Sequence, residues 1–294
     1  MKEQFLMEKN PWISRASDGR FSETQLSETL LQRLRAEAAK EAICFYSSFF
    51  SVDKRALNVH ELCEAYNHYH SEAIQLGLFK KGGVREKDHL NFWCLSKVLN
   101  PDFYVESGVF IGSSLHAFID NESLKKVVAI DPDLSKLKLP LAKGEKFTLI
   151  DDKDFSELSF NNLPSNSLAY FDDHIDSARR IIQSQRYGLK YIIFDDSTGM
   201  QGLTQRLYPA FPTIPMILKS ELFEEGEEIS WSFTHPQSGI TRQTVTISEE
   251  LLAHCRTAEK LIKRVAKLPD LGDYIPLTTP TPMYDMTKYI IELY

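Results

Sequence analysis

Apolar residues in the first third of the chain recur at the spacing of helices. From Ser22 to Phe50, leucine and alanine repeat every three or four positions, and the segment opens with a Ser-x-x-Gln pattern typical of a helix start. Residues 58–79 and 86–100 show the same periodicity, and Pro101 ends the last segment. The pattern therefore predicts a helical N-terminal cap over residues 1–100.

After Pro101 the pattern changes to short apolar runs separated by helix-like segments. The runs are FYVES, KVVAI, FTLI, LAYF and YIIFDDS. Strands that alternate with helices at this spacing indicate βαβ units feeding one parallel sheet, and unbroken apolar runs are typical of strands covered on both faces. We therefore expect a Rossmann-like, doubly wound and mostly parallel α/β core over residues 101–248.

The last part of the chain shows two further patterns. Residues 227–248 contain two alternating stretches around Pro236-Gln-Ser-Gly239, which predicts a hairpin that closes the sheet edge with an antiparallel pair. Residues 248–268 have the spacing of a basic amphipathic helix, followed by a Pro/Thr-rich connector and an apolar end. We expect residues 249–294 to form a C-terminal helix and tail packed on the core.

Composition narrows the function classes. The net charge of -7 argues against a nucleic-acid binder, which needs an excess of Lys and Arg to neutralise phosphates. The four cysteines are scattered and predict neither disulfides nor a zinc site. The chain shows neither an apolar leader nor a run of 18 apolar residues, so we expect no membrane partner and a cytoplasmic protein that acts on small molecules.

The first apolar run leads into a glycine loop. Glu106, Gly108 and Gly112 form E-x-G-x-x-x-G ahead of a helix. Glycine permits a sharp turn and a close approach of ligand to backbone, and the helix start with Ser113 or Ser114 favours an anionic group. The G-x-G-x-x-G pattern of dinucleotide binding is absent, which disfavours NAD.

This loop resembles the first motif of the class I S-adenosylmethionine-dependent methyltransferases. The resemblance implies a ribose-binding acid at the end of the second strand, where Asp131 stands, and an acid near the adenine at Asp152, with Asp151 or Asp154 as alternatives. The competing interpretation is that acids at strand ends only form turns and caps. The implied cofactor-binding residues are Glu106, Gly108, Gly112, Ser113, Asp131 and Asp152.

Two successive apolar runs end in Phe-Asp-Asp, at residues 171–173 and 194–196. The carboxyl ends of neighbouring parallel strands lie side by side, so these acids should approach one another, and convergent carboxylates repel unless something compensates them. Because adjacent strand residues point to opposite faces, we expect only one acid of each pair to reach the site. A cation with a preference for oxygen ligands would offset the repulsion.

The doubled motif resembles the metal-dependent O-methyltransferases of the catechol and macrocin types. That resemblance implies a divalent cation, Mg²⁺ or Mn²⁺, held by Asp173, Asp195 and Asp196, which would lower the pKa of an acceptor hydroxyl. The catechol-type lysine base is absent, because Asp176 stands in its place. We therefore expect His174, beside Asp173, to act as the base, with helix capping as the alternative role.

The sequence thus predicts a methyltransferase for a hydroxyl of a sugar, polyol or phenolic small molecule. Two alternatives stay open, a cephalosporin-hydroxylase-like enzyme of the same fold and a non-catalytic binding or scaffold protein. The N-terminal helices and the tail tyrosines at 284, 289 and 294 are candidates for an acceptor lid or a homodimer contact.

Overall fold

The computed structural model describes residues 13–15, 21–23, 26–53, 57–79, 84–141, 144–197, 203–205, 208–235, 239–275 and 287–294. Side chains are described from residue 26 onwards within these ranges, except for those of 196–210, 231–241 and 243.

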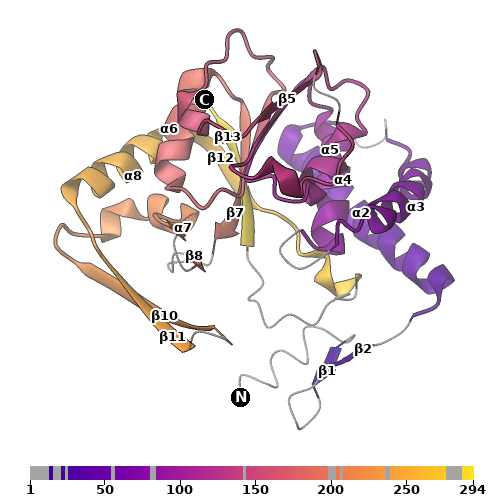
Figure 1. The fold of residues 1–294 in the computed structure, drawn as a ribbon, viewed down its shortest axis with the longest axis horizontal. Coiled ribbons are helices and arrows are strands. Elements are labelled where there is room, and N and C mark those ends of the chain that lie inside the picture. Colours follow the sequence, from indigo (N-terminus) through magenta and orange to yellow (C-terminus); the bar gives the residue numbers. More distant parts are fainter. Residues whose placement is uncertain are drawn as a thin grey trace.

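One seven-stranded sheet runs through the molecule (Figure 1). Its strands follow the order β12-β13-β7-β6-β3-β4-β5. The five strands β3, β4, β5, β6 and β7 are parallel to one another, whereas β13 is antiparallel to both β7 and β12. Within this sheet the chain begins at β3, an interior strand, moves outward through β4 to the edge strand β5, and then crosses back to β6 and β7 on the other side of β3. The bounds are β3 Phe103–Ser107, β4 Lys126–Ile130, β5 Phe147–Ile150, β6 Leu168–Phe171, β7 Tyr191–Ser197, β12 Ile262–Lys267 and β13 Thr287–Leu293.

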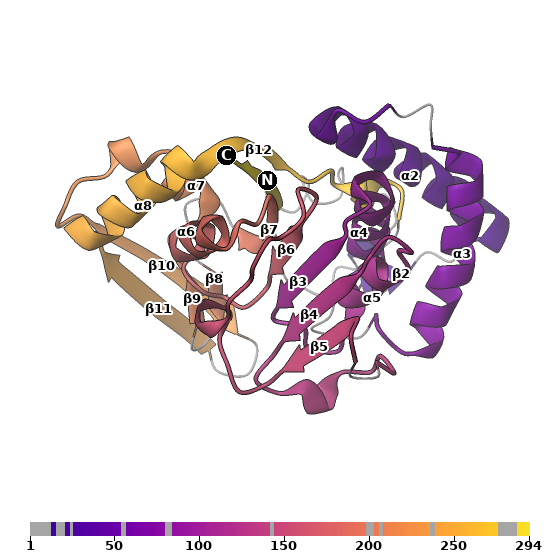
Figure 2. The ribbon, with the colours of Figure 1, turned by 90° about the horizontal axis from the view of Figure 1, so that it is seen from above.

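Helices cover both faces of this sheet, as expected for a doubly wound core (Figure 2). Helices α2 to α5 lie on one side, and α6 to α8 lie on the other. The helices are α2 Glu28–Phe50, α3 Val59–Gln75, α4 Glu86–Leu99, α5 Ser113–Ile119, α6 Ser177–Tyr187, α7 Ile214–Ile217 and α8 Glu249–Leu261, with short 3-10 turns at Leu134–Lys136, Phe155–Glu157, Ser220–Leu222 and Leu271–Asp273. The Rossmann-like α/β class predicted from the sequence is confirmed.

Side chains alternate between the two faces of the sheet along each strand, so the protein has two separate hydrophobic cores. Tyr104 of β3 and Tyr170 of β6 pack against the α2–α5 side, whereas their neighbours Val105 and Phe171 pack against the α6–α8 side. All four are buried. The continuous apolarity of these runs is therefore explained by burial on both faces.

The predicted N-terminal helices are present, with one correction. The start predicted at Ser22 is wrong, because Phe21–Glu23 forms strand β2, paired with β1 at Ile13–Arg15. Helix α2 begins at Glu28, where the Ser27 hydroxyl accepts a hydrogen bond from the Leu30 amide. A short polar residue at this later position satisfies an amide that lacks an intrahelical partner.

The C-terminal segment differs from the prediction. Helix α8 ends at Leu261 rather than near residue 268, because Ile262–Lys267 forms strand β12 and pairs with β13. The sheet therefore continues beyond residue 248 and includes two strands from the last part of the chain. Tyr289 is buried within β13 and Tyr294 is exposed, while Tyr284 lies outside the described residues.

The predicted hairpin exists but does not lie on the central sheet. Strands β10, Glu228–His235, and β11, Gly239–Thr246, form a two-stranded sheet of their own. The antiparallel edge of the main sheet is made by β13 and β12 instead. A second small pair joins β8, Leu203–Gln205, to β9, Tyr208–Ala210. None of the described helices has the length and apolarity needed to cross a bilayer.

Candidate functional site

The acids that follow the parallel strands gather at the carboxyl edge of the sheet. The strand order reverses at β3, because β4 lies on one side of β3 and β6 lies on the other. Ligand crevices in open α/β sheets form outside the carboxyl ends at such a reversal. The acids at this edge are Glu106 in β3, Asp131 after β4, Asp172 and Asp173 after β6, and Asp195 and Asp196 in β7.

The two faces of the sheet separate these acids into two groups. The Tyr170 hydroxyl donates to Asp195, and the charge of Asp172 acts on Tyr104, Tyr170 and Lys288, all on the α4 and α5 side. Asp173 binds α6 on the opposite side. The member of the first Phe-Asp-Asp that shares a face with Asp195 is thus Asp172, one residue before the predicted Asp173.

Glu106 lies fully buried at the end of β3. Tyr104 donates a 2.6 Å hydrogen bond to Oε2, and Ser114 on α5 donates a 2.6 Å hydrogen bond to Oε1. Burial raises the pKa of Glu106 to about 8, although both hydrogen bonds act in the opposite direction. Glu106 therefore joins β3 to helix α5 through Ser114, mainly as a neutral carboxyl group at pH 7.

The two glycines of the loop are required by the packing of the chain itself. Gly108 has φ +93°, and a Cβ there would lie 2.3 Å from the carbonyl oxygen of Asp172. Gly112 has φ +87° at the N-cap of α5, and its Cβ would lie 2.7 Å from Leu137 Cδ1. Gly108 thus allows the ends of β3 and β6 to approach closely, and Gly112 leaves room for the Leu137 side chain at the start of α5.

Asp131 joins the glycine loop to the end of β4. Its Oδ2 accepts a 2.7 Å hydrogen bond from the amide of Phe110, and its Oδ1 accepts a 2.8 Å hydrogen bond from the amide of Asp133. Phe110 is held with φ +47°, an uncommon value for a non-glycine residue. A carboxylate offers about four acceptor sites. Asp131 therefore keeps acceptor capacity for a vicinal diol, and it is only half-buried.

The remaining predicted cofactor residues follow Gly112 and strand β5. The Ser113 hydroxyl is buried and donates a 2.6 Å hydrogen bond to the Leu78 carbonyl. Asp152 is exposed in the bend after β5. Its alternative, Asp154, caps the following 3-10 helix, as the turn-and-cap interpretation predicts for such acids.

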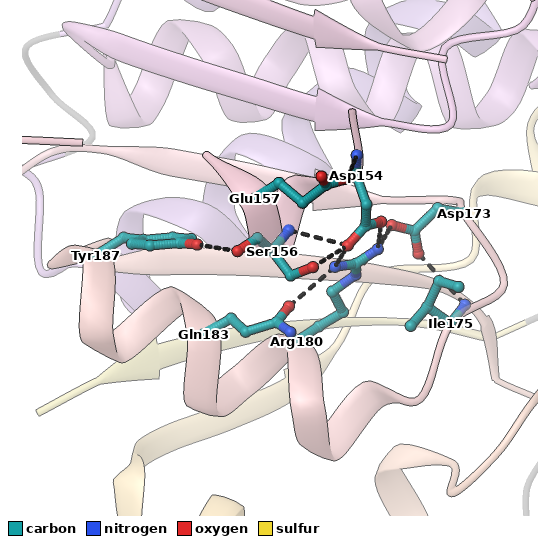
Figure 3. Close-up of polar contacts among 8 residues, drawn as sticks. All are labelled: Asp154, Ser156, Glu157, Asp173, Ile175, Arg180, Gln183 and Tyr187. Atoms are coloured by element: carbon teal, nitrogen blue, oxygen red, sulfur yellow. Dashed lines mark hydrogen bonds and ion pairs between the residues drawn. The ribbon is translucent and has the colours of Figure 1, made fainter. Parts of the chain in front are cut away.

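Arg180 on α6 binds the acids of two different loops (Figure 3). Its Nη2 lies 2.6 Å from Asp154 Oδ2 and 2.8 Å from Asp173 Oδ2, and its Nη1 donates to Gln183. The guanidinium side chain is 1% exposed. Burial would raise the pKa of Asp154, but hydrogen bonds from Arg180 and Ser156 hold it well below its usual range. Asp173 is therefore neutralised by the chain and turned toward α6.

Asp195 is neutralised in a similar way by Lys288 of β13. Lys288 Nζ lies 3.0 Å from Asp195 Oδ1 and 3.5 Å from Asp88 Oδ1 in the first turn of α4, and the lysine side chain is 9% exposed. The Tyr170 hydroxyl donates a 2.5 Å hydrogen bond to Asp195 Oδ2. Burial alone would lower the pKa of Lys288, but the carboxylates of Asp195 and Asp88 raise it above its usual value.

The predicted metal ligands do not fit a divalent cation in this arrangement. Asp173 and Asp195 face opposite sides of the sheet, and each contacts a basic side chain. The side chain of Asp196 lies outside the described residues. Within the described ranges, no three Asp, Glu, His or Cys side chains converge as a metal site.

His174 lies in the loop between Asp173 and helix α6. It has φ +54°, a left-handed backbone conformation that is costly for a non-glycine residue and is enriched at functional sites. Asp176, rather than His174, caps α6 by accepting from the Arg179 amide. The assignment of His174 as a base stays a prediction.

Lys288, Asp88 and Tyr170 were not identified from the sequence. The alternation of strand side chains pairs Tyr170 with Asp172, which is a signal that could have selected Tyr170. Nothing in the sequence joins Lys288 to Asp195 or to Asp88 of α4, because these contacts depend on the pairing of β13 with β7 and on the packing of α4.

Comparisons with known proteins give only distant similarities. No family model matches the chain, and no curated protein matches its sequence. An O-methyltransferase from Bacillus cereus, solved with SAH, aligns at TM-score 0.37 and 9% identity over 77% of this chain and 89% of its own. A SAM-dependent methyltransferase from Leishmania major aligns at 0.35 and 11% over 96% of each chain, and a SAM-dependent O-methyltransferase from Thermotoga maritima aligns at 0.35 and 12% over 76% and 70%. The similarities are too low to establish a family.

Proposed function

We propose that this chain is an S-adenosylmethionine-dependent methyltransferase that methylates a hydroxyl group of a small molecule. The observation that carries the proposal is the glycine loop at the switch point of the sheet, tied by Asp131 to the end of the next strand. The loop and Asp131 occupy the place where open α/β sheets bind nucleoside ligands.

The residues at this edge suit the chemistry of the cofactor. Asp131 would hold the ribose hydroxyls through its remaining acceptor sites, and the backbone of the loop from Gly108 to Gly112 would lie against the adjoining part. Asp172, at the end of β6, would add negative charge near a ligand that is cationic. When bound, S-adenosylmethionine supplies a methyl group activated by a sulfonium.

The β6, β7 and β13 side of the edge offers groups for a hydroxyl acceptor. A hydroxyl both donates and accepts hydrogen bonds, and the Asp195–Lys288 pair presents a carboxylate acceptor beside an ammonium donor. This pair would orient the acceptor oxygen, and proximity of oriented reactants supplies a large part of enzymatic acceleration. His174, in the loop between β6 and α6, is the proposed base that takes the hydroxyl proton.

Calorimetric titration with S-adenosylmethionine tests the cofactor assignment. We expect the wild type to bind and Asp131→Asn to bind at least tenfold more weakly, because amide substitution removes the charge and one acceptor oxygen. Asp133→Asn is the matched control, since it changes the same charge in the same loop on an exposed side chain paired with Lys136. Equal affinity in wild type and Asp131→Asn, with unchanged melting temperatures, would overturn the assignment.

A second measurement distinguishes methyl transfer from the alternatives. The protein is incubated with S-adenosylmethionine and a panel of sugars, polyols and phenols, and S-adenosylhomocysteine is quantified. Its formation supports the proposal, whereas acceptor-dependent oxygen consumption supports the hydroxylase-like alternative. Cofactor binding without product from any acceptor favours the scaffold alternative.

A further inference from the structure

We infer that Lys288 is a resident cation that replaces a divalent metal at the acceptor side of this site. The position of Lys288 between carboxylates is a property of the folded chain and does not depend on the proposed function. Only the role of Lys288 in methyl transfer rests on the proposed function. Lys288 acts as a positioning residue that holds Asp195 rather than as a base.

The first argument is the position of Lys288. Its Nζ lies between two carboxylates from different elements, 3.0 Å from Asp195 of β7 and 3.5 Å from Asp88 of α4. Asp172, at the end of β6, also contributes to the field at Lys288. Two carboxylates from two elements therefore flank one nearly buried ammonium, and their repulsion is compensated by a cation that the chain itself supplies.

The second argument concerns how the backbone delivers this side chain. The pairing of β13 with β7 shifts register between Thr287 and Tyr289, so Lys288 sits at an irregularity. Bulges of this kind redirect one side chain near active sites. After this irregularity, regular pairing of β13 with β7 resumes, from Tyr289 opposite Phe194 to Glu292 opposite Tyr191.

The third argument is that both oxygens of Asp195 already have a role. Oδ1 faces Lys288, and Oδ2 accepts from the Tyr170 hydroxyl. A metal bound here would have to displace the ammonium or the phenol. With Lys288 present, we expect the wild type to work without added metal, whereas removal of the ammonium should turn Asp195 and Asp88 into a cation site.

The test is titration of the full chain with Mn²⁺ alone, with free Mn²⁺ measured by electron paramagnetic resonance. We expect Lys288→Met to bind Mn²⁺ at least tenfold more tightly than the wild type and Lys288→Arg, and to lose this gain when Asp195→Asn is added. Lys125→Met is the control, because it removes a lysine from an exposed pair with the single acid Asp102. Mn²⁺ should also raise the melting temperature of Lys288→Met but not that of the control.

Two results would overturn the inference. One is Mn²⁺ binding by the wild type that Asp195→Asn abolishes, which would show that a metal coexists with Lys288. The other is a folded Lys288→Met that gains no Mn²⁺ affinity. If Lys288→Met does not fold in the absence of metal while Lys288→Arg does fold, recovery of the fold on addition of Mn²⁺ supports the inference. Failure to recover the fold with Mn²⁺ contradicts it. The Mn²⁺ titration contains no cofactor and no acceptor. Its failure is therefore distinct from a failure of the proposed methyl transfer.

Discussion

Asp173 Oδ2 lies 3.0 Å from Arg180 Nε and 2.8 Å from Arg180 Nη2, so the loop after β6 is fastened to the helix that follows it. The same guanidinium reaches Asp154, which follows β5. Arg180 thereby joins the loops that follow β5 and β6 (Figure 3), two strands that are separated in the sheet by β4 and β3. This contact fixes the loop that carries His174.

We predict that Arg180→Met destabilises the protein by about 3 kcal/mol, because removal of one partner from a buried ion pair leaves uncompensated charge. Urea denaturation measures this change. Arg186→Met, on an exposed position of the same helix, is the control and should change stability by less than about 0.5 kcal/mol. Equal effects of the two substitutions would show that Arg180 does not fasten the loops.

Gly108→Ala should be far more costly than Gly188→Ala. Both glycines have positive φ, but a Cβ at Gly108 would meet the backbone of Asp172, whereas nothing lies within 4 Å of a Cβ at Gly188. Left-handed backbone alone costs an alanine about 1–2 kcal/mol, and overpacking adds about 1–3 kcal/mol. Denaturation midpoints of the two variants measure the difference, and equal costs would show that β3 and β6 are not so close.

The buried carboxyl of Glu106 predicts a specific pH dependence. Its pKa is about 8 when folded, against 4.5 as the ordinary value, so the folded state holds a proton that the unfolded state has lost. Stability from this group is complete below about 4.5 and is lost as pH rises through about 8. As pH rises over this range, the melting temperature of the wild type should therefore fall relative to that of Glu106→Gln. Parallel curves of melting temperature against pH for the two proteins would contradict the assignment.

Tyr170→Phe should cost about 1.5–3 kcal/mol, because the lost hydroxyl donates to a charged, largely buried carboxylate. Tyr187→Phe is the matched control, since its hydroxyl donates to the Ser156 carbonyl in an exposed setting. Thermal unfolding of both variants gives the comparison. A smaller effect for Tyr170 than for Tyr187 would show that Asp195 does not depend on this hydrogen bond.

Much of the sheet could be predicted from the sequence because each parallel strand is apolar on both faces. The strand β12 was missed, since Ile262–Lys267 continues the basic amphipathic pattern of α8 without a proline or glycine stop. Its conformation depends on pairing with β13, which is a tertiary effect. The hairpin at 228–246 was recognised, but its separation from the main sheet has no local signal.

The sequence predicts where the candidate site lies in the sheet but not which side chains contact one another there. Strand ends located the acids correctly, but choosing between Asp172 and Asp173 required the direction of the chain after Phe171. The question of what compensates the doubled Phe-Asp-Asp is answered for Asp173 and Asp195 by Arg180 and Lys288. Both cations come from elements whose packing a single sequence does not reveal.

A crystal structure of the chain with S-adenosylhomocysteine tests the central claim most directly. We predict that the adenosyl group lies against the loop from Gly108 to Gly112, with its ribose hydroxyls on Asp131 and its sulfur facing the side of Asp195 and Lys288. Binding of the nucleoside away from the carboxyl ends of β3 and β4 would contradict the account, as would a structure in which saturating ligand leaves that edge vacant.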